Sequence, residues 1–206
     1  VRDPEALIKA IQIHQISILE PVPSLMDVLL QSECAKTELP SLRWVLPTGE
    51  ALPPATARNW FSHFPAIPLM NAYGPAECAD DVAFSPVIEA PDDAVVNMPI
   101  GLPTANACLH VVDGNLNRVP LGVVGELAVA GTGVGRGYRE NPGRTAAVFL
   151  PNPFNCSGQR LYLTGDLVKR LTDGSLEYIG RKDFQVKIRG YRIELGEIES
   201  VLLLQP

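Results

Sequence analysis

The segment Asn71-Ala-Tyr-Gly-Pro-Ala-Glu77 holds side chains suited to binding a nucleotide. It follows a predicted strand, and in layered α/β sheets ligands bind where strands end. Tyr73 offers a flat face to a purine, Asn71 an amide that can read base edges, and Gly74 a close backbone approach. Glu77 supplies a hard oxygen ligand of the kind that magnesium prefers. The spacing alone leaves a second interpretation open, a turn with a half-buried tyrosine.

A second group of nucleotide-binding side chains begins at Tyr162-Leu-Thr-Gly-Asp166. We expect Asp166 to lie at the end of a strand, where a carboxylate can accept both hydroxyls of a ribose. Arg181 and Arg192 can neutralise phosphate oxygens with their planar, multi-donor guanidinium groups. The alternative is a solvated basic strand with scattered ion pairs. That alternative explains the basic residues between the two arginines better than it explains the Thr-Gly-Asp turn.

Alternating glycines fill the segment from Gly131 to Gly137. They do not make a dinucleotide fingerprint, because that motif needs a helix opening directly within the glycines and an acidic residue about twenty positions further on. Here Arg139-Glu-Asn-Pro142 intervenes. We interpret the segment as a tight, bulged β structure that packs against the site or shields it.

Strands and helices alternate over about the first ninety residues. Apolar spacing and proline positions predict helices over 4–15, over 24–30 with Ser24 as the cap, and over 53–63. Short apolar runs predict strands over 16–19, 43–46 and 68–73. This order is typical of a parallel sheet in a layered α/β fold.

Short alternating strands follow after about residue 90, over 109–113, 124–130 and 175–179, and the pattern is barrel-like. Asp173-Gly174 predicts a hairpin in which both central residues take positive φ, and Asp113-Gly114 a second one. Near the end, a strand over 185–188 and a helix over 194–204 begin what resembles a new small domain.

The composition excludes several classes of protein. The chain has 206 residues, is 46% hydrophobic and carries a net charge of -6, with its basic residues scattered, so nucleic acid and anionic membranes are not expected partners. No apolar run approaches the roughly 20 residues that span a bilayer, and no signal peptide opens the chain, so we expect a cytoplasmic protein. Four distant cysteines and three histidines do not predict a zinc site.

These motifs resemble, in order, successive core motifs of the acyl- and aminoacyl-adenylating (AMP-binding) superfamily. The motifs are Asn-Ala-Tyr-Gly-Pro-Ala-Glu, Gly-Glu-Leu-Ala-Val-Ala-Gly-Thr-Gly-Val-Gly-Arg-Gly-Tyr, Tyr-Leu-Thr-Gly-Asp-Leu and Gly-Arg-Lys-Asp-Phe-Gln-Val-Lys-Ile-Arg-Gly-Tyr-Arg-Ile-Glu-Leu-Gly-Glu-Ile-Glu. The last, with Thr48-Gly-Glu-Ala-Leu52, is most similar to adenylation domains of nonribosomal peptide synthetases. The resemblance covers essentially the whole chain.

The resemblance implies an α/β fold: a partial adenylate-forming core, with a layered α/β part over 1–95 and a distorted, barrel-like β subdomain over 96–182. Residues 183–206 would be the hinge and the beginning of a small C-terminal α+β domain. The start away from Met and the end inside an apolar run suggest an internal piece of a longer polypeptide. The family's phosphate loop, its amino-group-binding aspartate and its late lysine would lie outside these residues, so we expect the piece alone to be inactive.

The implied reaction joins an amino acid to ATP as aminoacyl-AMP with release of pyrophosphate, and then transfers it to a carrier-protein phosphopantetheine thiol. ATP or AMP and Mg²⁺ are the implied cofactors, and peptidyl carrier and condensation domains of one assembly line the implied partners. Catalysis in such an enzyme is largely positioning and charge neutralisation.

The resemblance assigns roles to single residues of the nucleotide site. Asn71 and Tyr73 would bind adenine, Glu77 magnesium and Asp166 the ribose. Tyr178 and Arg181 would contact the ribose and phosphate, Arg192 would contact a phosphate, and Asp183 would be the hinge. Gly49, Ala72 and Gly74 would contribute backbone to the nucleotide site. Ala76 departs from the family's usual threonine, whose hydroxyl meets the α-phosphate. Loss of one hydrogen bond of about 0.5–1.5 kcal/mol weakens binding before it abolishes it.

An amino-acid pocket is also implied, and its lining residues would be Glu20, Leu46, Thr48, Ala72, Asp80 and Asp81. Three of the six are acidic, so we expect a basic amino acid such as ornithine, lysine or arginine. The alternative is that Asp80 and Asp81 face solvent outside the pocket.

Two other functions stay open. One is a stand-alone acyl-CoA or aryl-acid ligase, which shares the tyrosine, Thr-Gly-Asp and hinge motifs. The other is a non-catalytic remnant, either a split portion that needs its partner or a degenerate module.

Overall fold

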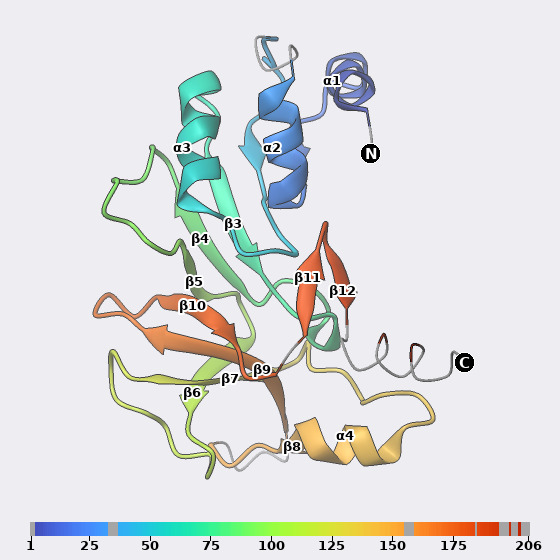
Figure 1. Cartoon of the computed structure of the whole chain (residues 1–206). Helices are drawn as coiled ribbons and strands as arrows, with labels where there is room; N and C mark the ends of the chain where they lie inside the picture. The colour runs from blue at the N-terminus through green and yellow to red at the C-terminus, as the bar shows by residue number, and fades with distance from the viewer. Residues whose placement is uncertain are drawn as a thin grey trace. The chain divides into compact units, whose positions relative to one another are not determined.

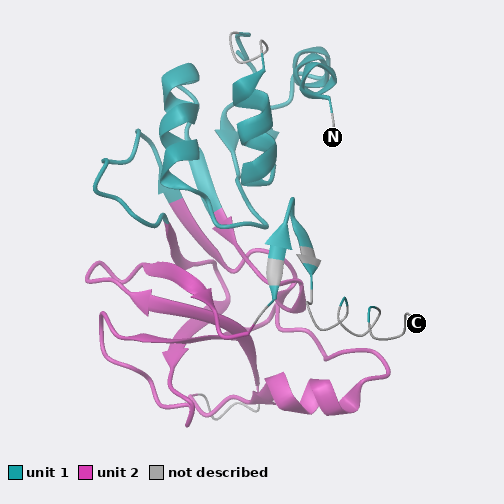
Figure 2. Ribbon diagram, in the orientation of Figure 1, with its two compact units in different colours: residues 1–71, 86–98, 184–206 teal, residues 72–85, 99–183 magenta. Residues whose placement is uncertain are grey.

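The computed structural model describes residues 3–32, 37–154, 159–183, 185–193, 198 and 202 (Figure 1). The chain divides into two compact units (Figure 2). Unit 1 comprises residues 1–71, 86–98 and 184–206, and unit 2 comprises 72–85 and 99–183. The chain passes between them in strands β3 (Leu69–Tyr73) and β4 (Ala83–Val87). The three-part domain division expected from the sequence stays a prediction.

Unit 1 contains helices α1 (Pro4–Ile13), α2 (Pro23–Gln31) and α3 (Pro54–His63), each with proline in its first turn. Proline suits that position because the first N–H groups of a helix have no partner within it. The Asp3 side chain caps α1 by accepting the N–H groups of Glu5 and Ala6. The predicted cap of α2 is wrong: Val22 precedes the helix, and Ser24 lies inside it with its N–H donated to Glu50 Oε2 at 3.1 Å.

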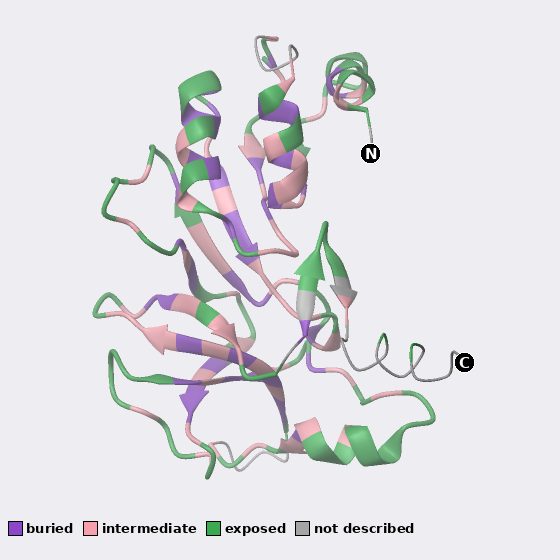
Figure 3. Ribbon diagram, viewed as in Figure 1, coloured by how far each residue is buried: buried purple, intermediate pink, exposed green. Residues whose placement is uncertain are grey.

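The sheet of unit 1 is parallel, as expected from the alternating elements. Strand β1 (Ile18–Leu19) pairs with β2 (Trp44–Val45), and β2 pairs with β3 through Val45 and Leu69. The paired stretches of β1 and β2 are shorter than the apolar runs that predicted them. Buried apolar residues of these strands and of the helices share one core, which includes Ile11, Met26, Leu29, Val45, Trp60 and Leu69. Figure 3 shows buried residues on strand β3 and on helices α2 and α3, which also carry exposed residues.

Strands β11 (Val186–Ile188) and β12 (Tyr191–Ile193) form an antiparallel hairpin in unit 1. Its turn, Arg189-Gly190, has positive φ at both residues. The Gly190 N–H donates to Glu50 Oε1 at 2.9 Å, so one carboxylate joins this turn to the start of α2. The predicted strand over 185–188 is confirmed. Of the predicted helix over 194–204, Ile198 and Leu202 are described and helical, and the rest lies outside the described residues.

Unit 2 is built mainly of antiparallel strands in the order β4-β5-β10-β9-β7-β6, with β8 paired to β9. Beyond β4, its elements are β5 (Pro99–Pro103), β6 (Ala107–Val112), β7 (Val124–Gly131), α4 (Pro142–Val148), β8 (Phe149–Pro151), β9 (Arg160–Arg170) and β10 (Leu176–Arg181). The predicted strands over 109–113, 124–130 and 175–179 are confirmed.

The sequence pattern missed β4 and β5, and the reason is their turn-like composition. Strand β4 contains Pro86, and β5 begins and ends with proline around Gly101. Gly101 has φ +85°, and a Cβ there would lie 1.9 Å from the Phe84 carbonyl oxygen. Proline and glycine of this kind mark strand edges and close backbone approaches, so they obscure a strand that tertiary pairing nevertheless forms.

The hairpin at Asp173-Gly174 is confirmed, but its geometry differs from the expected one. The Leu171 N–H donates to the Ser175 carbonyl at 2.8 Å, and Gly174 has φ +88°. Asp173 does not take positive φ. Its carboxylate accepts instead from the N–H and hydroxyl of Ser175, at 2.9 and 2.6 Å, and these bonds lower its pKa. At the second predicted turn, Val112 and Arg118 form an isolated antiparallel bridge.

His110 of β6 is half-buried and stacks on Phe154, with 4.3 Å between ring centroids. Burial and the guanidinium groups of Arg118 and Arg170 lower its pKa to about 4. Between about pH 6.5 and 4 the unfolded chain therefore binds a proton that the folded chain excludes, and stability falls as the pH falls through this window.

We expect His110→Gln to lose this part of the pH dependence. Urea unfolding at a series of pH values would measure the effect, and exposed His14 offers a control, His14→Gln, that keeps it. Parallel stability curves for wild type and His110→Gln between pH 6.5 and 4 would contradict the prediction.

Within the described residues, no helix combines the length and the apolar character that crossing a membrane requires.

Candidate functional site

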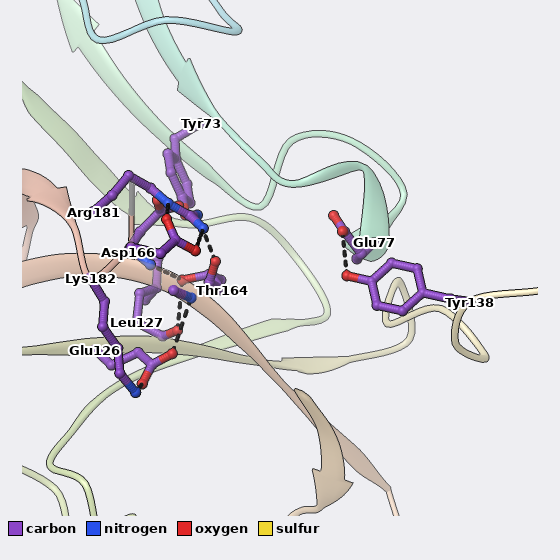
Figure 4. A network of polar contacts seen from close by, with 11 residues as sticks. Tyr73, Glu77, Glu126, Leu127, Tyr138, Thr164, Asp166, Arg181 and Lys182 are labelled. Atoms are coloured by element: carbon purple, nitrogen blue, oxygen red, sulfur yellow. Dashed lines mark hydrogen bonds and ion pairs between the residues drawn. The ribbon is translucent and has the colours of Figure 1, made fainter. Parts of the chain in front are cut away.

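Asp166 is the centre of a polar network in unit 2 (Figure 4). Its Oδ2 accepts a short hydrogen bond from the Tyr73 hydroxyl, and its Oδ1 accepts from Arg181 Nη1 at 2.9 Å. The residue is only 8% exposed. Tyr73 ends β3, Asp166 belongs to β9, and Arg181 ends β10. Three segments far apart in the sequence thus bring one carboxylate, one phenol and one guanidinium together.

A bulge in β9 directs Asp166 toward these partners. Ala128 of β7 pairs with Leu163 of β9, and Glu126 pairs with Leu167, so two steps along β7 oppose four along β9. Between these pairs, the three residues Thr164-Gly-Asp166 of β9 therefore face the single residue Leu127 of β7. They are the Thr-Gly-Asp turn that the sequence pattern placed at a strand end. That placement is wrong, because β9 continues to Arg170. Bulges re-aim side chains within a continuing strand, which reconciles the turn-like sequence with the observed strand.

Thr164 and Gly165 fix the shape of the bulge. The Thr164 hydroxyl donates to the Leu127 carbonyl at 2.8 Å and accepts the Asp166 N–H at 3.0 Å. Gly165 has φ +75°, and a Cβ there would lie 2.8 Å from Arg181 Nη2. Its N–H donates to Glu126 Oε1 at 3.1 Å, and Lys182 binds the other oxygen of Glu126 at 3.1 Å. No pattern in the sequence had marked Thr164 or Glu126 as supports of the candidate site.

Arg181 has acceptors on all sides of its guanidinium. Nη1 also donates to the Thr164 carbonyl at 2.7 Å, while Nε and Nη2 bind both oxygens of Asp183 at 2.9 and 2.6 Å. Burial acts to lower its pKa, but Asp183 and Asp166 together raise it above the ordinary value. Arg181 is therefore a fixed cation at any working pH.

Tyr73 and Tyr178, which both respond to the charge of Asp166, stay protonated. Burial, and then Asp166, raise the pKa of Tyr73 well above its ordinary value. Burial and Asp166 also raise the pKa of Tyr178 to about 12, although Arg181 acts in the opposite direction. Neutral phenols next to an ion pair can donate hydrogen bonds and present an apolar ring face.

Glu77 is separate from the Asp166 network within unit 2 (Figure 4). It lies in a single 3₁₀ turn, Ala76–Cys78, and its Oε1 accepts from the Tyr138 hydroxyl at 2.7 Å. The other oxygen, Oε2, is buried. One hard carboxylate is a suitable donor for Mg²⁺, which commonly binds one or two carboxylates together with substrate phosphates. The residue thus fits the metal that the sequence implied.

The glycine-rich segment after β7 packs directly on the Glu77 turn. The Gly135 N–H donates to the Glu77 carbonyl at 2.8 Å. A Cβ on Gly133 would lie 2.6 Å from the Cys78 carbonyl oxygen. The interpretation as a packing segment is therefore confirmed, although the strand itself ends at Gly131. Burial and Glu77 raise the pKa of the Cys78 thiol to about 12, so this cysteine is not a nucleophile.

The remaining expected site residues are divided between the units. Unit 1 holds exposed Glu20, half-buried Leu46, Thr48 and Gly49, buried Asn71, and Arg192, whose side chain lies outside the described residues. Unit 2 holds buried Ala72, half-buried Gly74 and Asp81, and exposed Ala76 and Asp80. Ala79 and Asp80 have positive φ, and Asp81 helps line a pocket of about 150 Å³ with Cys78, Val82, Thr104 and Thr132. No pattern in the sequence predicted this pocket.

The sequence matches the family model described as AMP-binding enzyme over residues 1–139. The chain belongs to the AMP-binding enzyme family. It is 45% identical over 203 residues to tyrocidine synthase 3 of Brevibacillus parabrevis, covering 98% of this chain and 3% of that protein. The expected resemblance to adenylation domains of nonribosomal peptide synthetases is thereby confirmed.

Two solved structures extend this similarity to the fold. Holo-PA1221, an NRPS protein containing adenylation and PCP domains bound to a vinylsulfonamide inhibitor, superposes with a TM-score of 0.89 at 30% identity, covering 99% of this chain and 35% of that one. The Vibrio cholerae adenylation domain AlmE, in complex with glycyl-adenosine-5'-phosphate, gives a TM-score of 0.80 at 32% identity, covering 95% and 37%. The expected adenylate-forming α/β fold is confirmed, and the chain spans a small part of its relatives.

Proposed function

We propose that the protein carrying this chain activates an amino acid with ATP as an aminoacyl-adenylate, releases pyrophosphate, and passes the aminoacyl group to a carrier-protein phosphopantetheine thiol. Family membership supports nucleotide chemistry, and the glycyl-adenosine-5'-phosphate in AlmE is the kind of intermediate proposed here. The observation that carries the proposal is the Asp166 network, since a buried carboxylate fixed by a phenol and a guanidinium suits a ribose diol.

Asp166 would receive the ribose. Each carboxylate oxygen can accept more than one hydrogen bond, so the bonds from Tyr73 and Arg181 orient the group and leave lone pairs for the two hydroxyls. Tyr178, whose pKa responds to the charges of Asp166 and Arg181, would lie on the ribose side. The bulge geometry holds the carboxylate before the nucleotide arrives, so binding requires little reorganisation.

Adenine would bind beside Tyr73 and Asn71, next to the backbone of Ala72 and Gly74. Asn71 is 3% exposed and Ala72 4% exposed, which fixes the backbone that precedes the tyrosine. Gly49 and Ala76 would contribute backbone to the same nucleotide site. The missing threonine hydroxyl at Ala76 removes one donor from the phosphate side.

Glu77 would hold Mg²⁺, which supplies charge neutralisation for the phosphates when bound. Arg181 would contribute a permanent positive charge near the ribose and phosphates, and Arg192 a second one in one conformation of the domain. The carboxylate of the amino acid is the nucleophile in the proposed reaction, so no protein side chain has to act as one. These residues would contribute positioning and electrostatic stabilisation.

Asp183 would be the hinge. It is the last residue of unit 2, and the chain after it belongs to unit 1. Its side chain is 51% exposed, and Arg181 Nη1 is held separately by Thr164 and Asp166, so the arginine keeps part of its hydrogen bonding when the pair opens.

The amino acid would enter a pocket that includes Glu20, Leu46, Thr48, Ala72, Asp80 and Asp81, and we propose a basic side chain. The acidic members support this choice, whereas the exposure of Asp80 supports the alternative that it faces solvent.

Amino-acid-dependent exchange of pyrophosphate into ATP by the full-length protein tests both proposals. We expect exchange with ornithine, lysine or arginine, and none without an amino acid. Exchange with only aliphatic or aromatic amino acids would overturn the basic pocket alone. Exchange with only carboxylic acids that lack an amino group would favour an acyl or aryl-acid ligase, and no exchange with any acid a non-catalytic module.

A further inference from the structure

The Tyr138 hydroxyl is placed to orient the Glu77 carboxylate. We propose that Tyr138 is a positioning residue for the divalent cation, acting through Glu77; this inference depends on the proposed function, which assigns the cation to Glu77. The two residues are 61 positions apart in the sequence, and the hydroxyl donates to Oε1 at 2.7 Å. Figure 4 shows Tyr138 and Glu77 apart from the Asp166 network.

Contacts of both its backbone and its ring fix the position of Tyr138. Its backbone N–H donates to the Thr145 hydroxyl at 2.9 Å. The Arg144 guanidinium lies over the ring, 4.9 Å from the centroid, and Phe149 meets it edge-on at 5.6 Å. Gly137 has φ +127°, and a Cβ there would lie 2.3 Å from the Thr145 methyl group. The chain can therefore approach α4 this closely only with glycine before the tyrosine.

The backbone of Glu77 is held by the same segment that supplies Tyr138. Gly135 donates its N–H to the Glu77 carbonyl at 2.8 Å, three residues before Tyr138 reaches the side chain. One short stretch thus fixes both the main chain and the carboxylate of Glu77. The bonds to the carbonyl and to the carboxylate already restrict the rotation of the Glu77 side chain. Less conformational entropy is therefore lost when a cation binds.

The direction of the hydrogen bond suits this role. Because the Tyr138 hydroxyl is the donor, it orients the carboxylate through Oε1 without adding a negative charge next to the proposed cation.

Tyr138→Phe removes only the hydroxyl and keeps the ring between Arg144 and Phe149. We expect the affinity of the full-length protein for Mn²⁺, measured by electron paramagnetic resonance with a non-hydrolysable ATP analogue present, to fall about tenfold. The apparent Mg²⁺ requirement for pyrophosphate exchange should rise by a similar factor, while the KM for the amino acid stays within about twofold. The matched control is Tyr191→Phe, since Tyr191 is 75% exposed.

A double-mutant cycle with Glu77→Ala separates positioning from a general structural role. If Tyr138 acts through Glu77, Tyr138→Phe has no further effect on Mn²⁺ affinity in the Glu77→Ala background. Unchanged Mn²⁺ affinity in Tyr138→Phe, or full additivity with Glu77→Ala, would overturn the inference. Failure of the proposed function has a different signature: the wild-type protein would show no amino-acid-dependent exchange, or Glu77→Ala would bind Mn²⁺ as wild type does.

Discussion

Replacing Asp166 by alanine is expected to destabilise the fold by about 3 kcal/mol, because it leaves the Tyr73 hydroxyl and one guanidinium edge without their buried acceptor. The side chains of Arg181 and Asp166 are only 16% and 11% exposed, so water cannot readily replace the lost carboxylate. The same change removes the proposed ribose ligand, and the KM for ATP should rise on the order of a hundredfold through loss of two charge-assisted hydrogen bonds.

Urea unfolding and pyrophosphate exchange measure the two effects of the Asp166 substitution. The control is Asp93→Ala, since Asp93 pairs with Arg58 through a side chain that is 96% exposed. We expect that control to change stability by less than about 0.5 kcal/mol. Asp166→Asn should retain more stability than alanine, because the amide oxygen can still accept one bond, but not the ribose affinity. A stable Asp166→Ala protein with an unchanged KM for ATP would contradict both assignments.

The helices and parallel strands of unit 1 could be predicted because local signals agree with the tertiary structure. Prolines mark all three helix starts, and short apolar runs mark the strands between them. The prediction that failed was the N-cap of α2. Ser24 is a good capping residue by type, but it lies inside the helix, and its N–H donates to Glu50 from a distant segment. A cap can be decided by a partner 26 residues away, which no short window contains.

Unit 2 was predicted less completely because long-range pairing determines its strands. Strand β5 contains proline at both ends and Gly101 at its closest approach to β4, so its composition resembles a loop. Strand β9 runs for 11 residues straight through a Thr-Gly-Asp sequence that favours a turn. The bulge accommodates the turn preference of Thr-Gly-Asp within a strand that continues. It can be recognised only from the register of β9 with β7.

The types of the candidate site residues could be chosen from sequence, whereas their contacts could not. Asp166 and Arg181 were recognised by chemistry, and the structure brings them together. The hydrogen bond from Tyr138 to Glu77 joins two separate motifs, and neither motif contains a signal for the other. Tyr138 lies at the end of a glycine-rich stretch, and nothing in that stretch predicts that its hydroxyl binds the carboxylate of Glu77, 61 residues away.

Gly74→Ala is expected to disrupt the loop over residues 74–81, which carries Glu77. A Cβ at this position would lie 1.9 Å from the Asp80 carbonyl oxygen and 2.5 Å from the Asp81 Cα, and both are backbone atoms. The loop cannot easily move, because the Val82 N–H is bonded to the Tyr73 carbonyl at 2.8 Å and closes it. Overpacking of this kind costs at least about 2 kcal/mol. Displacement of the loop would also carry Glu77 away from Tyr138, so Mn²⁺ affinity should fall together with stability.

Gly143→Ala is the matched control for Gly74→Ala, since it adds the same methyl group at a position with no atom within 4 Å and ordinary φ in helix α4. Alanine is the better helix former, so we expect this variant to be more stable by about 0.5–1 kcal/mol. Urea unfolding of the two variants should therefore give shifts of opposite sign, with Mn²⁺ affinity lowered only for Gly74→Ala. Equal midpoints for the two proteins would show that the loop can accept a side chain at residue 74, and the tight closure around Glu77 would then not be required for metal binding.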